Sequence, residues 1–253
     1  MIIYFTGTGN SLSVANTIAS VTGDAVVHLS KAPTDLTSES TVGFVYPVYY
    51  YETPHVIQDY LKTIKLSKDT YVFSVVTCGG SQGNTSATLK KYVEQAGGQL
   101  SYAKVLVMPD NSAIGFGGNC DDQIPDLPQN MADARRIAED IKARKQDSSC
   151  FKGMKAAALM NAPVLFVNLL ALPLKHKTDL AKCTGCGICV RLCPTANLSL
   201  VDGKVAQGSH CALCLACVHA CPTQANILKF AKSTDAANQY LNPDVSLTDM
   251  FLR

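Results

Sequence analysis

Eight of the cysteines fall into two runs that share one spacing. In each run, three cysteines stand at steps of three, and a fourth follows four residues later, directly before a proline. This C-x2-C-x2-C-x3-C-P pattern is that of the thiolate ligands of 4Fe-4S clusters. The runs are Cys183, Cys186, Cys189 and Cys193, and Cys211, Cys214, Cys217 and Cys221. The spacing predicts two clusters, whose chemistry is electron transfer.

The ligands of the two clusters are expected to cross between the runs, because the fourth cysteine of such a run binds the other cluster. One predicted set is Cys183, Cys186, Cys189 and Cys221, and the other is Cys211, Cys214, Cys217 and Cys193. Disulfides and structural zinc are the alternatives. Disulfides suit small secreted domains, and zinc prefers two separated pairs of cysteines. We therefore expect iron–sulfur clusters.

The N-terminus carries a second chemical pattern, an apolar strand over residues 1–5 followed by a glycine-rich loop and a helical pattern. The loop residues are Thr6, Gly7, Thr8, Gly9, Asn10 and Ser11. Backbone amides and a helix N-terminus at such a loop bind phosphate. A Walker loop would need a lysine, and a dinucleotide fingerprint would need glycine in place of Leu12. The loop resembles the phosphate loop of flavodoxins; a plain turn with an Asn or Ser helix cap is the alternative.

Apolar segments alternate with helical patterns over the first 147 residues. We expect strands at 1–5, 25–29, 41–48, 69–77 and 99–108, and helices after the first loop and at 55–64, 85–96 and 131–145. This alternation predicts an α/β fold with a doubly wound, five-stranded parallel sheet in the flavodoxin-like order 2-1-3-4-5.

Two further loops should join the phosphate loop, because ligands of such sheets bind beyond the carboxyl ends of the strands, where the strand order reverses. Residues 46–51 would provide an aromatic or backbone wall for a flavin ring, and residues 77–84 would meet its pyrimidine edge. The predicted contacts are Pro47, Val48, Tyr49, Tyr50, Tyr51, Thr77, Cys78, Gly79, Gly80, Gly83 and Asn84. The alternative for the tyrosines is packing at a strand end, and Cys78 is more often a small buried filler.

The composition is that of a globular protein: 253 residues, 47% hydrophobic and 17% charged. A net charge of +2 without a long basic run gives no case for nucleic-acid binding. The first residues lack the basic region of a signal peptide. Eleven cysteines without such a signal indicate a reducing interior. We expect a cytoplasmic protein.

The segment 156–174 contains no charged residue and is long enough to span a bilayer. Two asparagines and two prolines interrupt its apolar face, which would be costly in lipid. We therefore expect a buried connecting helix without membrane contact. The predicted organisation is a flavin domain at 1–147, a linker at 148–177, a two-cluster domain at 178–230 and a tail at 231–253.

Taken together, the motifs resemble the fused flavodoxin–ferredoxin family of anaerobic bacteria and archaea over nearly the whole chain. The resemblance implies FMN and two 4Fe-4S clusters that relay electrons between one- and two-electron partners. Redox proteins would be its partners, and the oligomeric state, monomer or homodimer, stays open. The alternative is a flavin-dependent reductase of a small molecule bound under the loop 109–128. Only Glu52 and His55 offer acid–base groups near the flavin loops, which favours the electron carrier.

Overall fold

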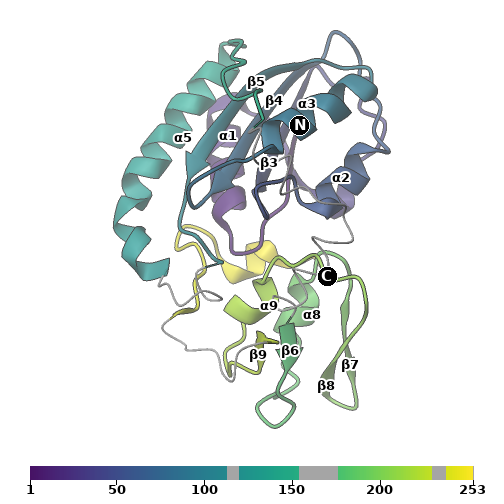
Figure 1. Ribbon diagram of the computed structural model, residues 1–253, viewed down its shortest axis with the longest axis vertical. Helices are drawn as coiled ribbons and strands as arrows, with labels where there is room; N and C mark the ends of the chain where they lie inside the picture. The colour runs from purple at the N-terminus through teal and green to yellow at the C-terminus, as the bar shows by residue number, and fades with distance from the viewer. Residues whose placement is uncertain (113–119, 154–175, 230–237, 253) are drawn as a thin grey trace. The chain divides into compact units, whose positions relative to one another are not determined.

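The computed structural model describes residues 1–112, 120–153, 176–229 and 238–252 (Figure 1). The chain divides into two compact units. The first unit contains Met1–Thr6, Asn10–Met108 and Asp126–Met160, and the second contains Gly7–Gly9, Pro109–Pro125 and Asn161–Arg253. The domain limits at residues 147, 177 and 230 stay predictions.

The first unit is built on one five-stranded sheet. Its strands are β1 (Ile2–Tyr4), β2 (Val26–His28), β3 (Thr41–Pro47), β4 (Tyr71–Cys78) and β5 (Leu100–Val107). All neighbouring strands are parallel, and their order is β2-β1-β3-β4-β5. The central strands are buried along nearly their whole length, as in parallel sheets covered on both faces. The predicted fold class and strand order are confirmed.

Helices cover both faces of this sheet. They are α1 (Asn10–Thr22), α2 (His55–Leu61), α3 (Thr85–Gln95) and α5 (Leu127–Lys142). Helices α1 and α5 lie side by side on one face, and α2 and α3 lie on the other (Figure 1). Apolar residues at helical spacing, such as Leu12, Ala15 and Ile18 in α1, face the sheet and are buried. The core of the unit is therefore a sheet between two layers of helices.

Several predicted boundaries in this unit differ from the structure. We expected a loop through Pro128 and a helix from residue 131, but α5 begins at Leu127 after a short 3-10 helix, η2 (Cys120–Asp126). Pro128 lies in the first turn of α5, where a missing N–H costs no helical hydrogen bond. Helix α2 ends at Leu61 instead of residue 64.

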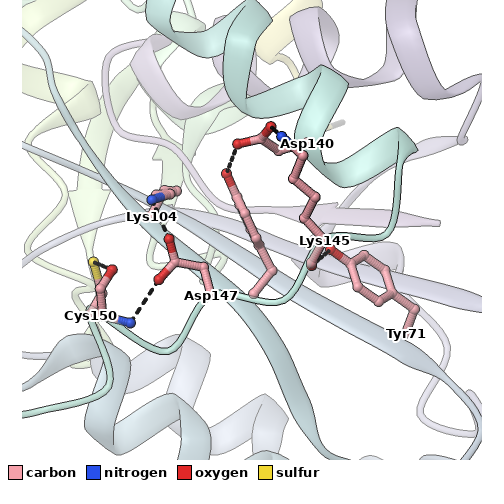
Figure 2. Close-up of polar contacts among 8 residues, drawn as sticks. Tyr71, Lys104, Asp140, Lys145, Asp147 and Cys150 are labelled. Atoms are coloured by element: carbon pink, nitrogen blue, oxygen red, sulfur yellow. Dashed lines mark hydrogen bonds and ion pairs between the residues drawn. The ribbon is translucent and has the colours of Figure 1, made fainter.

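The segment after α5 is fixed to the edge strand β5. The backbone N–H of Asp147 donates to the oxygen of Ser101 at 3.0 Å, and the N–H of Ala103 donates to the oxygen of Asp147 at 3.2 Å. The Asp147 carboxylate also accepts from Lys104 Nζ at 2.5 Å (Figure 2). These contacts cover the β5 edge, which would otherwise expose unpaired backbone groups.

A second set of contacts in Figure 2 closes the end of α5 over the sheet. The hydroxyl of Tyr102 and Nζ of Lys145 both donate to the Asp140 carboxylate, at 3.1 and 2.6 Å. The hydroxyl of Tyr71 donates to the backbone oxygen of Lys145 at 2.7 Å. Burial raises the pKa of Tyr102 well above its ordinary value, so this hydroxyl stays a donor.

The second unit is built from short elements. Strand β6 (His176–Thr178) pairs antiparallel with β9 (Asn226–Leu228), and β7 (Leu198–Val201) pairs antiparallel with β8 (Lys204–Gln207). Its short helices are α8 (Ile188–Leu192), α9 (Ala216–His219) and the 3-10 helix η5 (Leu247–Met250). Asp202 and Gly203 connect β7 to β8 with φ values of 49° and 71°, as a tight hairpin turn requires.

The C-terminal tail is packed into the second unit, where Tyr240, Val245 and Met250 are buried. The apolar segment 156–174 and its expected helix lie outside the described residues. In the described part of the chain, no helix combines the length and apolar character needed to cross a bilayer.

Candidate functional site

Two of the predicted flavin loops and the start of α1 meet at the carboxyl edge of the sheet. The hydroxyl of Ser11 lies 2.9 Å from the hydroxyl of Thr77 at the end of β4, and these side chains are 1% and 2% exposed. The backbone N–H of Val48 donates to the oxygen of Thr77 at 2.9 Å. Thr77 therefore holds the chain after β3 and the first turn of α1 in place.

The loops after β3 and β4 are also joined to each other. The N–H of Asn84 donates to the backbone oxygen of Tyr51 at 2.8 Å. Gly83, with a φ of +57°, lies so close that a Cβ there would be 2.0 Å from the same oxygen. Any side chain at position 83 would force the two loops apart. The predicted residues of these loops are thus brought together in the first unit.

The three tyrosines of the first of these loops differ in their surroundings. Tyr49 packs edge-on against Phe5, with ring centroids 6.1 Å apart. Tyr50 and Tyr51 have φ values of 53° and 59° and are 39% and 46% exposed. This backbone turns both rings away from the core. Two aromatic rings at a sheet edge can cover the face of a planar ring system.

In the loop after β4, Cys78 is partly exposed, and Gly79 and Gly80 are exposed. Their backbone groups can therefore be reached by a ligand at this edge. Pro47 and Val48, at the end of β3, are partly exposed as well. The structure places all these residues at the edge where they were predicted, and their contact with flavin stays a prediction.

The loop between β1 and α1 has the geometry of an anion site. Helix α1 begins at Asn10, with no acidic residue in its first turn. The first backbone N–H groups of a helix lack intrahelical partners and carry partial positive charge. Gly9 has a φ of +96°, which favours glycine. Along the loop Thr6 is partly exposed, and Gly7, Thr8, Gly9, Asn10 and Ser11 are buried. These features fit a phosphate group.

In the second unit, cysteines of the two runs lie close together, and Cys193 and Cys217 pack against a buried cluster that contains cysteines of both runs. Cys183, Cys189 and Cys221 share one buried core cluster. Electrostatic interaction links Cys189 to Cys186 as well as to Cys221. The second run thus contributes its last cysteine to the first set. Their role as ligands stays a prediction.

The other set lines a pocket, whose walls include Cys193, Cys211, Cys214 and Cys217. Burial raises the pKa of the Cys214 thiol to about 12, and it raises the pKa of the Cys217 thiol well above its ordinary value. Thiolates so deeply buried need nearby positive charge, which iron ions would provide. The donor set therefore fits an iron–sulfur cluster.

Backbone amides point at several of the cysteine sulfurs. The N–H of Asn197 lies 3.2 Å from Cys193 Sγ, and the N–H of Ala225 lies 3.2 Å from Cys221 Sγ. The N–H of Leu213 donates to Cys211 Sγ at 3.4 Å. Such bonds stabilise a thiolate over a thiol.

The two runs also share one backbone conformation. Equivalent residues have positive φ in both: Gly185 and Leu213, Gly187 and Leu215, and Ala196 and Gln224. Leucine in this conformation costs on the order of 1 kcal/mol or more. A strained conformation repeated at equivalent positions indicates that both loops fold around the same kind of bound group.

One histidine beside these cysteines was not predicted to be functional. His219, between Cys217 and Cys221, is 3% exposed, and burial lowers its pKa to about 4. Its ring contacts Asn111 and Tyr240, which are remote in the sequence. Both partners contribute backbone atoms, so no residue type in the sequence could have indicated this arrangement.

The family comparison agrees with the cysteine-containing part of the chain. Residues 182–225 match the family model of the 4Fe-4S dicluster domain. Among solved structures, an archaeal flavodoxin has a TM-score of 0.41 and 11% identity, with 56% of this chain and 95% of that chain covered. Megasphaera elsdenii flavodoxin has a TM-score of 0.38 and 19% identity, with 55% and 97% covered.

An azoreductase from Bacillus anthracis has a TM-score of 0.37 and 12% identity, with 55% of this chain and 98% of that chain covered. Because these three scores are below 0.5, we assign the fold of the first unit from its strand order and parallel strand pairing. The search for relatives among curated proteins finds no match.

Proposed function

We propose that this chain, which joins a flavodoxin-like sheet to a 4Fe-4S dicluster domain, relays electrons between two 4Fe-4S clusters and FMN. Redox proteins would supply and accept the electrons, and the cysteine usage supports a reducing compartment such as the cytoplasm. When bound, the clusters exchange single electrons and the flavin exchanges one or two. The chain would thereby connect one-electron and two-electron partners.

The observation that carries this proposal is the packing of cysteines from the two runs against each other. Cys221 shares a buried cluster with Cys183 and Cys189, and Cys193 lines a pocket with cysteines of the second run, which supports the crossed sets. Two thiolate sets of four, each completed by the other run, are the ligands of a two-cluster domain. The buried cysteines would then shield each cluster from water, and the backbone N–H groups near the sulfurs would stabilise the thiolates.

The residues at the sheet edge would bind and orient the flavin. Ser11 and the first turn of α1 would hold its phosphate, since a helix N-terminus attracts an anion. Tyr50 and Tyr51 would cover the ring and limit access of water, and the backbone of residues 79–80 with Asn84 would contact its polar edge. Thr77 keeps these elements in register through its contacts with Ser11 and Val48.

The test is anaerobic purification followed by counting of the cofactors. We expect about eight iron ions, about eight sulfide ions and one FMN per chain. Electron paramagnetic resonance of the reduced protein should show two interacting 4Fe-4S clusters. Colourless protein that contains zinc and releases no flavin on heating would contradict the proposal.

Stopped-flow reoxidation then separates a carrier from an enzyme. A carrier delivers electrons rapidly to redox proteins and one-electron dyes. Saturable reoxidation by one class of metabolite, with slow transfer to proteins, would instead identify a flavin-dependent reductase.

A further inference from the structure

The ring of His219 is held on both sides within the second unit. Its Nδ1 accepts from the backbone N–H of Tyr240 at 2.9 Å. Its Nε2 lies 2.9 Å from the backbone oxygen of Asn111. Because Nδ1 accepts from an amide, the ring proton lies on Nε2, which donates to Asn111. The tautomer of His219 is therefore fixed by two segments of the chain.

Both of these segments continue to Thr8 of the phosphate loop. The Asn111 side chain donates from Nδ2 to the Thr8 hydroxyl at 3.4 Å. The backbone N–H of Asn242, two residues after Tyr240, donates to the Thr8 carbonyl oxygen at 2.8 Å. His219 is thus connected to Thr8 by two routes, one through Asn111 and one through the tail residues 240–242. We call this closed set of contacts the circuit, and all of it lies inside one unit.

The circuit is tightly packed at Thr8 and Gly9. Thr8 and Asn242 are both buried. A Cβ at Gly9 would lie 3.0 Å from Cβ of Asn242. The tail therefore contacts the phosphate loop directly, and it engages the carbonyl side of Thr8. Backbone amides, the groups that bind phosphate, belong to the opposite side of each peptide unit.

The tail is also attached to the helices that carry the cysteines. Nε2 of Gln239 donates to the backbone oxygens of Val218 and Cys221, at 2.8 and 2.9 Å. At the other end of the tail, the N–H of Leu252 donates to the oxygen of Arg191 in α8 at 2.9 Å. Displacement of α9 would therefore move the tail residues that contact Thr8.

We propose that His219 is a positioning residue that ties the cysteine-bearing helix α9 to Thr8, so that the geometry of the cluster loop sets the affinity of the phosphate loop for FMN. This coupling rests on the proposed function. Each ring nitrogen holds one arm of the circuit. Removal of the ring takes the hydrogen-bond partner from the buried Tyr240 amide and from the partly buried Asn111 carbonyl, and such losses are larger than the net value of the bonds themselves.

The test is FMN titration of cluster-loaded, flavin-depleted protein, followed by flavin fluorescence. His219→Phe fills the space and breaks both arms, and we expect about tenfold weaker binding. His219→Gln places an amide near Nε2, and His219→Asn places an oxygen near Nδ1. Each variant should keep one of the two hydrogen bonds and bind FMN about threefold more weakly. The matched control is His210→Phe, at an exposed histidine directly before Cys211, where binding should not change.

Hydrogen exchange gives a readout that does not depend on flavin. The Tyr240 amide should exchange faster in His219→Phe and stay protected in His219→Asn. If His219 acted through packing alone, the Tyr240 amide would exchange at the same rate in His219→Asn and His219→Gln. Equal exchange and equal FMN affinity in all variants with unchanged iron content would overturn the proposal.

A second variant covers the case in which His219→Phe does not assemble its clusters. Asn111→Ala removes the donor to Thr8 and leaves the cysteine runs intact; we expect about threefold weaker FMN binding. Unchanged affinity there would also overturn the coupling. Absence of FMN binding by the wild-type protein would overturn the proposed function itself, whereas a loss confined to the variants supports the coupling.

Discussion

The hydroxyl of Ser11 lies 2.9 Å from the hydroxyl of Thr77, and both side chains are buried. Ser11 lies in the first turn of α1 and Thr77 is the last residue but one of β4, so the contact joins residues that are 66 positions apart in the sequence. It connects the anion-binding end of α1 to the loop expected to meet the flavin ring. The two halves of the proposed flavin site are therefore held in one geometry before any ligand binds.

We expect Thr77→Val to weaken FMN binding about fivefold and to lower the free energy of unfolding by about 1 kcal/mol, because the Ser11 hydroxyl loses a buried partner. FMN titration and urea denaturation measure the two effects. The matched control is Ser74→Ala in the same strand, where the hydroxyl is buried without a hydrogen-bond partner in the described structure. That variant should bind FMN like the wild type. Equal behaviour of the two variants would show that the Ser11 contact contributes nothing.

The crossed cysteine sets make a prediction about iron content. Cys214→Ala removes a residue of one set, and Cys221→Ala removes a residue of the other. Each should reduce iron from about eight to about four per chain, and the two remaining spectra should differ. Iron analysis and electron paramagnetic resonance are the measurements. Cys150→Ser, outside both runs, should retain all the iron; retention of full iron in Cys214→Ala would refute the assignment.

The sequence was sufficient for the sheet. Mostly apolar segments such as Val72–Val76 identify buried parallel strands, whereas the crossed cysteine sets stay a prediction from the repeated spacing. The start of α5 was missed because Pro128 was interpreted as part of a loop, although proline is well suited to a first helical turn.

The contacts of His219 could not be predicted in the same way. Asn111 is 108 residues away in the chain and offers only its backbone oxygen to the ring. Backbone groups are common to all residues, so the sequence carries no sign of which one is used. The positive φ values of Leu213 and Leu215 were equally hidden, because only alignment with Gly185 and Gly187 of the first run would have indicated them.

The two glycines of the first run should respond differently to a methyl group. A Cβ at Gly185 would lie 2.2 Å from the backbone oxygen of Gly203, whereas a Cβ at Gly187 has only Leu200 Cδ1 near it, at 3.8 Å. Both have positive φ, so Gly187→Ala should cost about 1 kcal/mol through backbone strain alone. Gly185→Ala must also displace the hairpin turn.

We therefore expect Gly187→Ala to keep full iron content and Gly185→Ala to lose the cluster bound by Cys183, Cys186 and Cys189. Iron analysis together with thermal denaturation distinguishes the two effects. Similar iron loss in both variants would mean that strain in the loop, and not contact with the hairpin turn, limits cluster assembly.

His28 predicts how the stability of the first unit depends on pH. Its ring is buried, its Nδ1 accepts from the N–H of Ser30 at 3.1 Å, and burial followed by the nearby charge of Lys31 lowers its pKa from 6.5 to about 4. The folded chain therefore binds this proton less readily than the unfolded chain. The neutral ring stabilises the fold above pH 6.5, and this contribution decreases as pH falls from 6.5 toward 4.

Between pH 7 and pH 5, His28 should thus reduce the free energy of unfolding by about 2 kcal/mol. His28→Asn keeps an acceptor for the Ser30 amide but does not titrate, so its stability should fall less over the same interval. Urea denaturation at both pH values, followed by circular dichroism, measures the change in the free energy of unfolding of each protein. Subtracting one change from the other removes the contributions of the other histidines. An identical pH dependence in the two proteins would show that His28 has the same pKa in the folded and unfolded states.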